Sequence, residues 1–359
     1  MTNFEPCSFN EWIVKNQKRQ VSLILAAGFE SRAKTSLSII GTNPAIELVG
    51  ALVFDYENQK ANEPTRTEIL KSLEDKLGNF NLIGMHDVHS LSDYVREQEN
   101  LNRAVLVDIT GMSRVWIFQI LHEMFNSKVP FHLIYTEADS YQPDQKFFDI
   151  LSKQIKQNDN IFDIYQEIEK KEIVYSYDCE VISPSEFLGY PEPGRPAILI
   201  GFLTYKRSRL QCILRSFEFS ARLLIITNPI REDLRWRRRL LELLNLDILE
   251  SRPPKKAYLP TLNPFIVSEY LEREIFMNSL CRNSNVYLAP LGSKTQTVGC
   301  YFFWRRNSDV SVIFSQPSKY YPDKYSEGSR DTFLFSYEQM FDHLGREFNS
   351  FSGDTIFKN

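Results

Sequence analysis

Residues 104–126 read AVLVDITGMSRVWIFQILHEMFN, and this stretch decides the fold class. The first part, 104–111, is a short apolar run of the kind that forms a strand buried on both faces. Apolar residues then recur at helical spacing through 113–126. A strand that leads directly into a helix is half of a βαβ unit, so the stretch predicts a parallel sheet flanked by helices.

The same alternation extends to both sides of this stretch. In the first part of the chain, predicted strands lie at 21–28, 46–56, 80–88, 104–111 and 129–138, with helices at 31–40, 65–78, 91–101 and 113–126. In the second part, predicted strands lie at 196–203, 221–230, 246–251, 285–292 and 309–318, with helices at 208–220, 233–245, 268–281, 295–306 and 335–348. We therefore expect an α/β protein with two Rossmann-like domains, mainly parallel sheets and flanking helices.

The alternation is interrupted between the two parts. Residues 142–160 form a polar segment of helical character, and YPEPGRP at 190–196 is rich in turn residues. We predict an N-terminal domain at 1–150, a linker region at 151–196 and a C-terminal domain at 197–359. The two domains have the character of a diverged structural duplication.

Composition excludes several classes of protein. A formal charge of −4 over 359 residues argues against a protein that binds nucleic acid non-specifically over its whole surface. This net charge still allows a local basic patch. The five cysteines are widely spaced, and the five histidines include a single close pair, so no metal site is expected. No signal peptide or membrane span is recognisable, which predicts a cytoplasmic protein with reduced thiols and no membrane partner.

Ligands of open α/β sheets bind beyond the carboxyl ends of the strands, so the strand-to-helix junctions are the candidate sites. The first junction is LILAAGFESRA, in which Gly28 permits a tight turn and Glu30 and Arg32 follow it. The helix that comes next directs its N-terminal amides to this turn. The alternative interpretation is a glycine turn with two solvated charges.

The second junction is VLVDITGMSRVW, where Asp108, Thr110, Gly111, Ser113 and Arg114 follow the strand. Backbone amides next to the glycine, two hydroxyl groups and a guanidinium together suit a phosphate. The carboxylate could bind a ribose hydroxyl or orient the arginine. The alternative is a helix that begins at a serine cap, with an arginine on the surface.

The third junction is VYLAPLGSKTQTVG, in which Gly292, Ser293, Lys294, Thr295 and Gln296 follow a predicted strand and begin a helix. The lysine is a mobile charge that can reach a phosphate, and the small residues keep the backbone accessible. The spacing of a P-loop is absent, so a P-loop ATPase is not expected. This junction too can be interpreted as a simple helix cap.

DITGMSR at 108–114 and LGSKTQ at 291–296 resemble the strand-end motif of CRISPR-associated Rossmann-fold (CARF) sensors, in which a strand leads into a Thr-Gly-Gly-Thr-Lys type turn. Members of that family bind cyclic oligoadenylates, and some carry two such domains in one chain. The first loop departs from the motif at Met112 and Arg114, and the second loop has one glycine. DITG also resembles the ribose-phosphate loop of phosphoribosyltransferases, without the second acidic residue of that loop.

Two further segments carry cations and aromatic residues. The predicted helix at 233–245 places Arg235, Arg237, Arg238 and Arg239 around Trp236, and we interpret it as a solvated basic face whose binding to nucleic acid is left open. A loop after the predicted strand at 309–318 contains several residues that could contact a base or a phosphate: Lys319, Tyr320, Tyr321, Tyr325 and Arg330.

No catalytic motif is recognisable beside these loops. The leading hypothesis is therefore a regulatory protein that binds a nucleotide or short oligonucleotide, as a sensor or accessory component of a prokaryotic defence system, without a cofactor. Its output would act through an effector protein, and homo-oligomerisation is left open. The alternative is a phosphoribosyl or N-glycosyl transferase or hydrolase that uses Glu30, Asp108 and Arg114.

Overall fold

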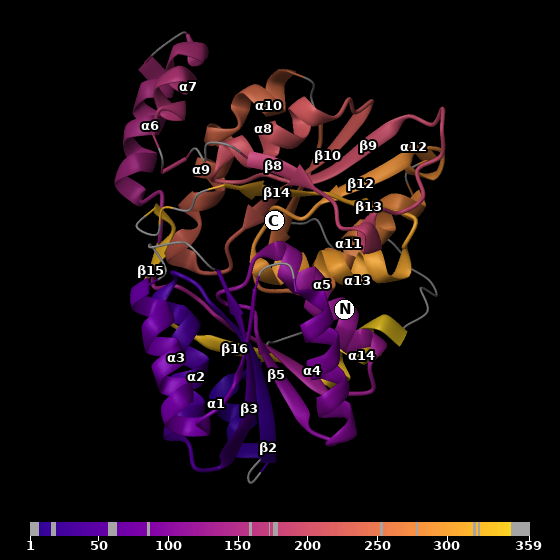
Figure 1. Ribbon diagram of the computed structural model, residues 1–359. Helices are drawn as coiled ribbons and strands as arrows, with labels where there is room; N and C mark the ends of the chain where they lie inside the picture. Colours follow the sequence, from indigo (N-terminus) through magenta and orange to yellow (C-terminus); the bar gives the residue numbers. More distant parts are fainter. Residues whose placement is uncertain are drawn as a thin grey trace.

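The computed structural model describes residues 7–15, 19–56, 63–84, 87–157, 160–171, 173–174, 179–251, 254–277, 279–318, 321 and 324–345. These residues form two α/β lobes, each built on its own sheet (Figure 1). Parallel strands flanked by helices dominate both lobes, which confirms the predicted α/β class. Among the residues described, no helix is both long enough and apolar enough to cross a bilayer.

The first lobe contains a seven-stranded sheet in the order β1-β16-β6-β5-β2-β3-β4. The five strands from β6 to β4 run parallel, whereas β16 and β1 pair antiparallel at one edge. The strands are β1 (Cys7–Ser8), β2 (Arg19–Ala27), β3 (Ile46–Asp55), β4 (Asn81–Gly84), β5 (Ala104–Asp108), β6 (Phe131–Thr136) and β16 (Thr332–Phe335).

Helices cover both faces of this sheet. They are α1 (Phe9–Lys15), α2 (Thr35–Thr42), α3 (Glu63–Leu77), α4 (Val88–Asn100), α5 (Arg114–Asn126) and α14 (Tyr337–Gly345). Successive residues of β2 point to opposite faces, so Leu23 and Leu25 join a cluster with residues of α1, α2 and α3. Ile24 and Ala26 join the cluster that contains α4 and α5. Burial on both faces explains why the strand is an unbroken apolar run.

The second lobe contains a five-stranded parallel sheet in the order β11-β10-β9-β12-β13. Its strands are β9 (Ala197–Phe202), β10 (Ala221–Asn228), β11 (Lys255–Pro260), β12 (Asn285–Ala289) and β13 (Ser311–Val312). Its helices are α8 (Arg207–Ser216), α9 (Trp236–Leu244), α10 (Leu246–Ser251), α11 (Pro264–Met277), α12 (Ser279–Arg282) and α13 (Lys294–Arg306).

One predicted strand of the second lobe is wrong. Residues 246–251 form helix α10, in which Ile248 and Leu249 are buried. The strand is β11, which begins with Lys255 and Lys256 and alternates between exposed and buried positions. Two lysines are a common way to protect an edge strand from pairing with other chains. They also made this segment look too polar to be recognised as a strand.

The segment between the lobes contributes helices and short strands. These are β7 (Ser140–Tyr141), α6 (Gln145–Gln157), α7 (Ile161–Glu169) and β8 (Cys179–Ile182). The predicted single strand at 309–318 is divided, because β13 belongs to the second sheet while β14 (Phe314–Pro317) pairs antiparallel with β8. Both pieces are mostly buried, so the sequence could not show the break between them.

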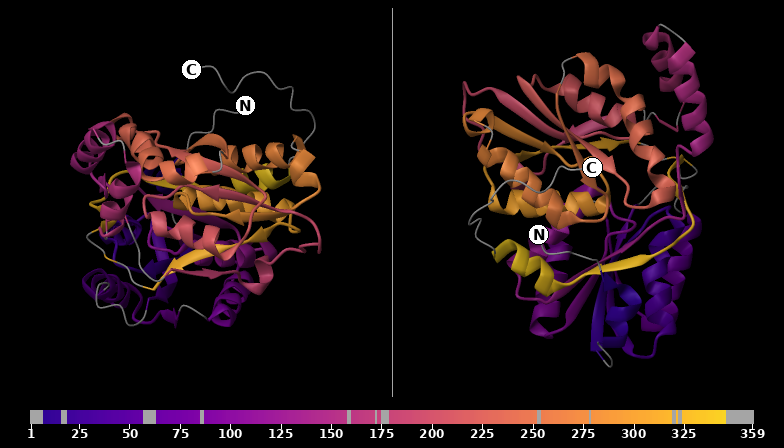
Figure 2. Two further views of the ribbon diagram at one scale, coloured as in Figure 1. Left: turned by 90° about the horizontal axis from the view of Figure 1, so that it is seen from above. Right: turned by 180° about the vertical axis from the view of Figure 1, so that it is seen from behind.

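The chain returns to the first lobe after β14. A short strand, β15 (Ser326–Glu327), pairs with β7, and β16 then pairs antiparallel with β6. Figure 2 shows this yellow segment running into the lobe of the indigo strands. Strand β16 is thus part of the first sheet, whereas the predicted boundary at 197–359 places it in the C-terminal domain. Helix α14 contacts both lobes, because the His343 carbonyl accepts from Arg306 of the second lobe and the His343 ring lies 4.9 Å from that of Phe265. The proposed limits of independently folding domains remain a prediction.

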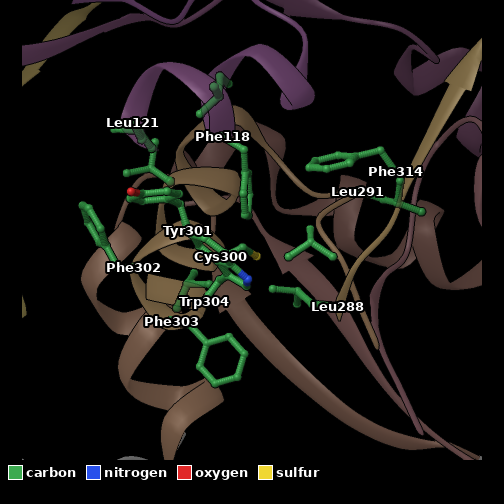
Figure 3. Close-up of a cluster of buried hydrophobic side chains, with 14 of the residues drawn as sticks. Phe118, Leu121, Leu288, Leu291, Cys300, Tyr301, Phe302, Phe303, Trp304 and Phe314 are labelled. Atoms are coloured by element: carbon green, nitrogen blue, oxygen red, sulfur yellow. The ribbon is translucent and has the colours of Figure 1, made fainter. Parts of the chain in front are cut away.

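The two lobes share one strand order and one hydrophobic core. In each sheet the fourth parallel strand along the chain, β5 or β12, lies beside the first, β2 or β9. The helices that follow these fourth strands, α5 and α13, pack on each other across the lobes. Phe118 lies 5.5 Å from Tyr301 between ring centroids, and Figure 3 shows Phe118 and Leu121 facing Tyr301 and Trp304. This shared core holds the two strand-end edges face to face.

Candidate ligand-binding site

A cavity of about 300 Å³ lies between the carboxyl ends of the two sheets. Residues that follow β2, β5 and β6 form one wall, and residues that follow β9, β10 and β12 form the other. Its volume is at the lower end of the range for small-molecule sites. Most sequence-predicted site residues line it: Gly28, Glu30, Arg32, Gly111, Ser113, Arg114, Gly292, Ser293 and Lys294.

The loops that follow β5 and β12 form hydrogen bonds with each other across the cavity. Arg114 donates hydrogen bonds of 3.0 Å to the Leu291 carbonyl and 2.7 Å to the Gly292 carbonyl. Lys294 donates in the opposite direction, to the Thr110 carbonyl. Each cation is the first helical residue after a serine cap, so the two contacts are reciprocal. Both cations are largely withdrawn from solvent, since the Lys294 side chain is 18% exposed and Arg114 is half-buried.

Glu30 is the acceptor around which the first junction is organised. Its carboxylate accepts from Arg32 at 2.8 Å, from Lys294 at 2.7 Å and from Ser326 at 2.7 Å. Burial alone would raise the pKa of Glu30, but the charges and hydrogen bonds of the two cations hold it well below its usual range. Glu30 is therefore ionised, and it joins the first lobe to Lys294 of the second lobe and to the loop that contains Ser326.

The backbone amides of the two loops already have acceptors. The Ser113 amide donates to the Tyr56 hydroxyl at 2.6 Å, and the Ser293 amide donates to the Gln296 Oε1 at 2.9 Å. Ser113 and Ser293 each cap the helix that follows, as the alternative interpretation of both junctions predicted. The expected phosphate cradle of these serine amides is thus filled by side chains of the protein itself.

Four predicted site residues do not line the cavity. Asp108 accepts from Ser36 and, at 2.8 Å, from the Thr110 amide, and burial raises the pKa of its carboxyl group. Thr110, Thr295 and Gln296 are fully buried. They bond to neighbouring backbone groups, which fixes the shape of the loops. These four residues lie outside the cavity wall and hold the loops that form it.

Both loop glycines are required by close contacts. A Cβ at Gly111 would lie 2.8 Å from the Ala26 carbonyl oxygen. A Cβ at Gly292 would lie 2.7 Å from the Phe202 ring and 2.4 Å from the Gln296 Oε1. From the sequence, we expected these glycines to expose backbone amides to a ligand. In the structure, their main role is to let the loops pack against the strand ends.

Positive charge dominates the cavity wall. Two carboxylates, Glu30 and Glu137, line it together with eight cationic side chains: Arg32, Arg114, Lys206, Arg209, Arg231, Arg237, Lys294 and Lys324. Several of these cations donate to neutral carbonyls, which satisfy a hydrogen bond without cancelling a charge. The cavity therefore has an excess of positive charge that suits an anion.

One arginine of the second lobe illustrates this pattern. Arg237 of α9 is 4% exposed and donates to the carbonyls of Tyr141, Gln142 and Pro143 of the connecting segment. Its guanidinium carbon also lies 4.2 Å from the centroid of the Tyr205 ring. The predicted solvated basic face therefore has a buried member, whereas Arg235, Arg238 and Arg239 are exposed.

A tyrosine covers part of the cavity. Tyr325 lies on the loop that carries the chain back to the first lobe, and the Lys206 ammonium stands 4.9 Å from its ring centroid. Arg209 donates to its hydroxyl at 3.0 Å, and Phe29 packs 5.2 Å away. Tyr325 was one residue of the aromatic loop singled out in the sequence. Lys319 and Tyr320 of that loop lie outside the described residues.

Sequence reasoning missed Lys206 and Arg209, although a signal for them exists. The predicted strand at 196–203 is followed directly by TYKRSR at 204–209. The strand-end rule applied to this fourth junction would have indicated both residues. Glu137 follows β6 and could have been found in the same way. No group of histidine, cysteine or acidic residues arranged for a metal ion is found in the described part of the chain.

No known protein family and no curated protein matches the chain. Among solved structures, it is similar to a type III CRISPR defence DNA nuclease activated by cyclic oligoadenylate, with 11% identity, a TM-score of 0.45 and coverage of 79% of this chain. The chain spans 63% of that nuclease. It is also similar to a universal stress protein from Archaeoglobus fulgidus DSM 4304, with 11% identity, a TM-score of 0.22 and coverage of 82% of this chain and 96% of the other. Similarities this low assign no function to the chain.

Proposed function

We propose that this protein is a regulatory protein that binds a nucleotide or short oligonucleotide in the cavity between its two lobes. The observation that carries the proposal is the charge of that cavity, where eight cations face two carboxylates. A wall of guanidinium and ammonium groups recognises phosphates, because both donate charge-assisted hydrogen bonds. Its placement beyond the strand ends of both sheets is where α/β proteins bind nucleotides.

The aromatic residues of the wall support a nucleotide over a simple inorganic anion. Phe29, Tyr56, Tyr205, Phe314 and Tyr325 line the same cavity as the cations. Aromatic rings offer flat apolar surface to a base, and stacking tolerates different bases. A ligand with phosphates and a base would use both kinds of surface.

Binding without catalysis is favoured by the state of the residues that the enzyme hypothesis requires. Glu30 already accepts from three donors, and Arg114 already donates to two carbonyls. Asp108 is buried and does not line the cavity. A ligand that bridges the lobes would instead change how firmly they are held, which is the action of a regulator.

A titration tests the proposal. The parent protein is titrated by calorimetry with ATP, GTP, cyclic dinucleotides, cyclic oligoadenylates and pyrophosphate, beside an Arg209→Ala variant. We expect at least one nucleotide to bind, and Arg209→Ala to weaken it about tenfold or more, since a charged hydrogen bond contributes about 1.5–3 kcal/mol. The matched control is Arg215→Ala, which removes an exposed arginine from the same helix α8.

The outcomes separate the hypotheses. Equal affinities of the parent and Arg209→Ala would contradict the proposed site. Conversion of a nucleotide during incubation, detected by chromatography of the products, would favour the enzyme. The role in defence rests on the resemblance of DITGMSR and LGSKTQ to CARF motifs. It requires cyclic oligoadenylates to bind more tightly than the mononucleotides do.

A further inference from the structure

Glu137 differs from every other charged residue of the cavity wall. It follows β6 and is 6% exposed. Its backbone is fixed on both sides, because its amide donates to the Asp331 carbonyl at 3.0 Å and its carbonyl accepts from the Arg330 amide at 2.9 Å. These bonds continue the pairing of β6 with β16 and hold the residue in the wall.

The carboxylate of Glu137 has no hydrogen bond or ion pair with the residues that the structure describes. Glu30, the other carboxylate of the cavity, accepts from three side chains. Burial raises the pKa of Glu137, and the nearby charges of Arg231 and Arg32 oppose this effect. Its oxygens are not among the sealed, unpaired polar atoms of the described residues, so they open onto the cavity. A ligand in the cavity can therefore donate hydrogen bonds to this carboxylate.

The chemistry of these donors follows from the carboxylate. An ionised carboxylate only accepts hydrogen bonds, and its two oxygens suit two adjacent donors. It repels phosphates, so it faces a neutral part of the ligand. In a nucleotide, adjacent donors occur as the vicinal hydroxyl groups of ribose and as the N1–H and N2–H groups of guanine.

We propose that the cavity binds its nucleotide in one direction, with a pair of neutral donors on Glu137 of the first lobe and the phosphates on the cations of the second lobe. This inference rests on the proposed function and adds an orientation and a recognition residue to it. Lys206 and Arg209 follow β9 in the opposite wall, so they are the phosphate-binding counterparts of Glu137.

The test compares Glu137→Gln with the parent protein. Glutamine has nearly the same shape, lacks the charge and offers a single acceptor oxygen. Both proteins are titrated with pyrophosphate, ATP, GTP, ITP and the 2′-deoxy forms of ATP and GTP. We expect Glu137→Gln to weaken the recognised nucleotide about tenfold or more, and to leave pyrophosphate binding unchanged or stronger because a repulsive charge is gone. The control is Asp331→Asn, which removes an exposed charge beside the site and outside the cavity wall.

The panel also identifies the donor pair. If ribose is recognised, ATP and GTP lose affinity equally in the variant, while their 2′-deoxy forms bind weakly to both proteins. If guanine is recognised, GTP and its 2′-deoxy form both lose affinity in the variant, whereas ATP is unaffected and ITP, which lacks the N2 amine, loses less. Equal effects of Glu137→Gln on nucleotides and pyrophosphate, or no effect on either, would overturn the inference. In that case, weaker binding by Arg209→Ala would leave the proposed function in place, whereas a parent protein that binds no nucleotide would refute both.

Discussion

The two lobes have the same order of parallel strands, but they bring different side chains to the cavity between them. The first lobe contributes both carboxylates, Glu30 and Glu137, whereas most of the cations follow strands of the second lobe. The helix that follows the fourth strand begins alike in both, with a serine cap and then a cation. A repeated fold thus supplies the frame and the reciprocal contacts, and the unlike residues at the strand ends supply the chemistry.

This comparison predicts that the second lobe depends most on the connecting segment at Arg237. Arg237→Ala should lower the free energy of unfolding by about 3 kcal/mol or more, because three carbonyls of the connecting segment lose their donor and each buried acceptor left unpaired costs about 1–3 kcal/mol. Chemical denaturation measures the change. Arg239→Ala, an exposed position on the same helix α9, should change stability by less than about 0.5 kcal/mol. Equal effects of the two variants would refute the role of Arg237.

Acid should lower the free energy of unfolding through His132, a buried residue of the first lobe. Burial lowers the pKa of His132 from 6.5 to about 4, so the folded protein binds fewer protons than the unfolded chain between these values. Stability is therefore lost as the pH falls from about 6.5 to about 4, and the loss amounts to about 3 kcal/mol. Unfolding curves over this range, with His132→Asn as the comparison, measure it. A variant that loses as much stability as the parent would show that other groups cause the effect.

The two loop glycines should behave alike if the loops are equivalent. Gly111→Ala and Gly292→Ala each force a Cβ against atoms that cannot easily move, so each should cost about 1–3 kcal/mol. Gly345→Ala in α14 meets no atom within 4 Å and should cost nothing measurable. Thermal unfolding compares the three variants. If one loop glycine tolerates alanine and the other does not, the equivalence of the loops is wrong.

The reciprocal contacts should have smaller effects on stability and clear effects on binding. Arg114→Ala and Lys294→Ala should each lower stability by about 1.5 kcal/mol, the value of a hydrogen bond made by a charged group. Each should also weaken a bound nucleotide about tenfold, because each removes a cation from the wall. Calorimetric titration and denaturation of the same samples separate the two effects. Unchanged binding in both variants would restrict these residues to joining the lobes.

The sequence predicted the parallel sheets because their strands are long, apolar and followed by amphipathic helices. Strands β11 and β16 were not predicted from the sequence. The two lysines of β11 make this edge strand look polar, and β16 pairs with β6, which lies almost 200 residues away. Pairing between distant segments leaves no local pattern in the sequence. The missed pairing of β16 explains why no return of the chain to the first sheet was expected.

The candidate site was predicted in position but not in detail. The strand-end rule located Gly28, Arg114 and Lys294, which do line one cavity. The sequence could not show that Arg114 and Lys294 bond to the opposite loop, because such contacts depend on how the lobes face each other. For the same reason, only the structure could show that the carboxylate of Glu137 is unpaired among the described residues.

Photoaffinity labelling tests most directly whether a nucleotide binds between the lobes. The protein is irradiated with an azido-nucleotide analogue of whichever nucleotide binds in the titration, and the modified peptides are identified by mass spectrometry. The account predicts labelled residues on both walls, near Tyr56 of the first lobe and Tyr205 of the second, and loss of the label when the unmodified nucleotide is in excess. Competed labelling confined to the outer surface of one lobe would contradict it.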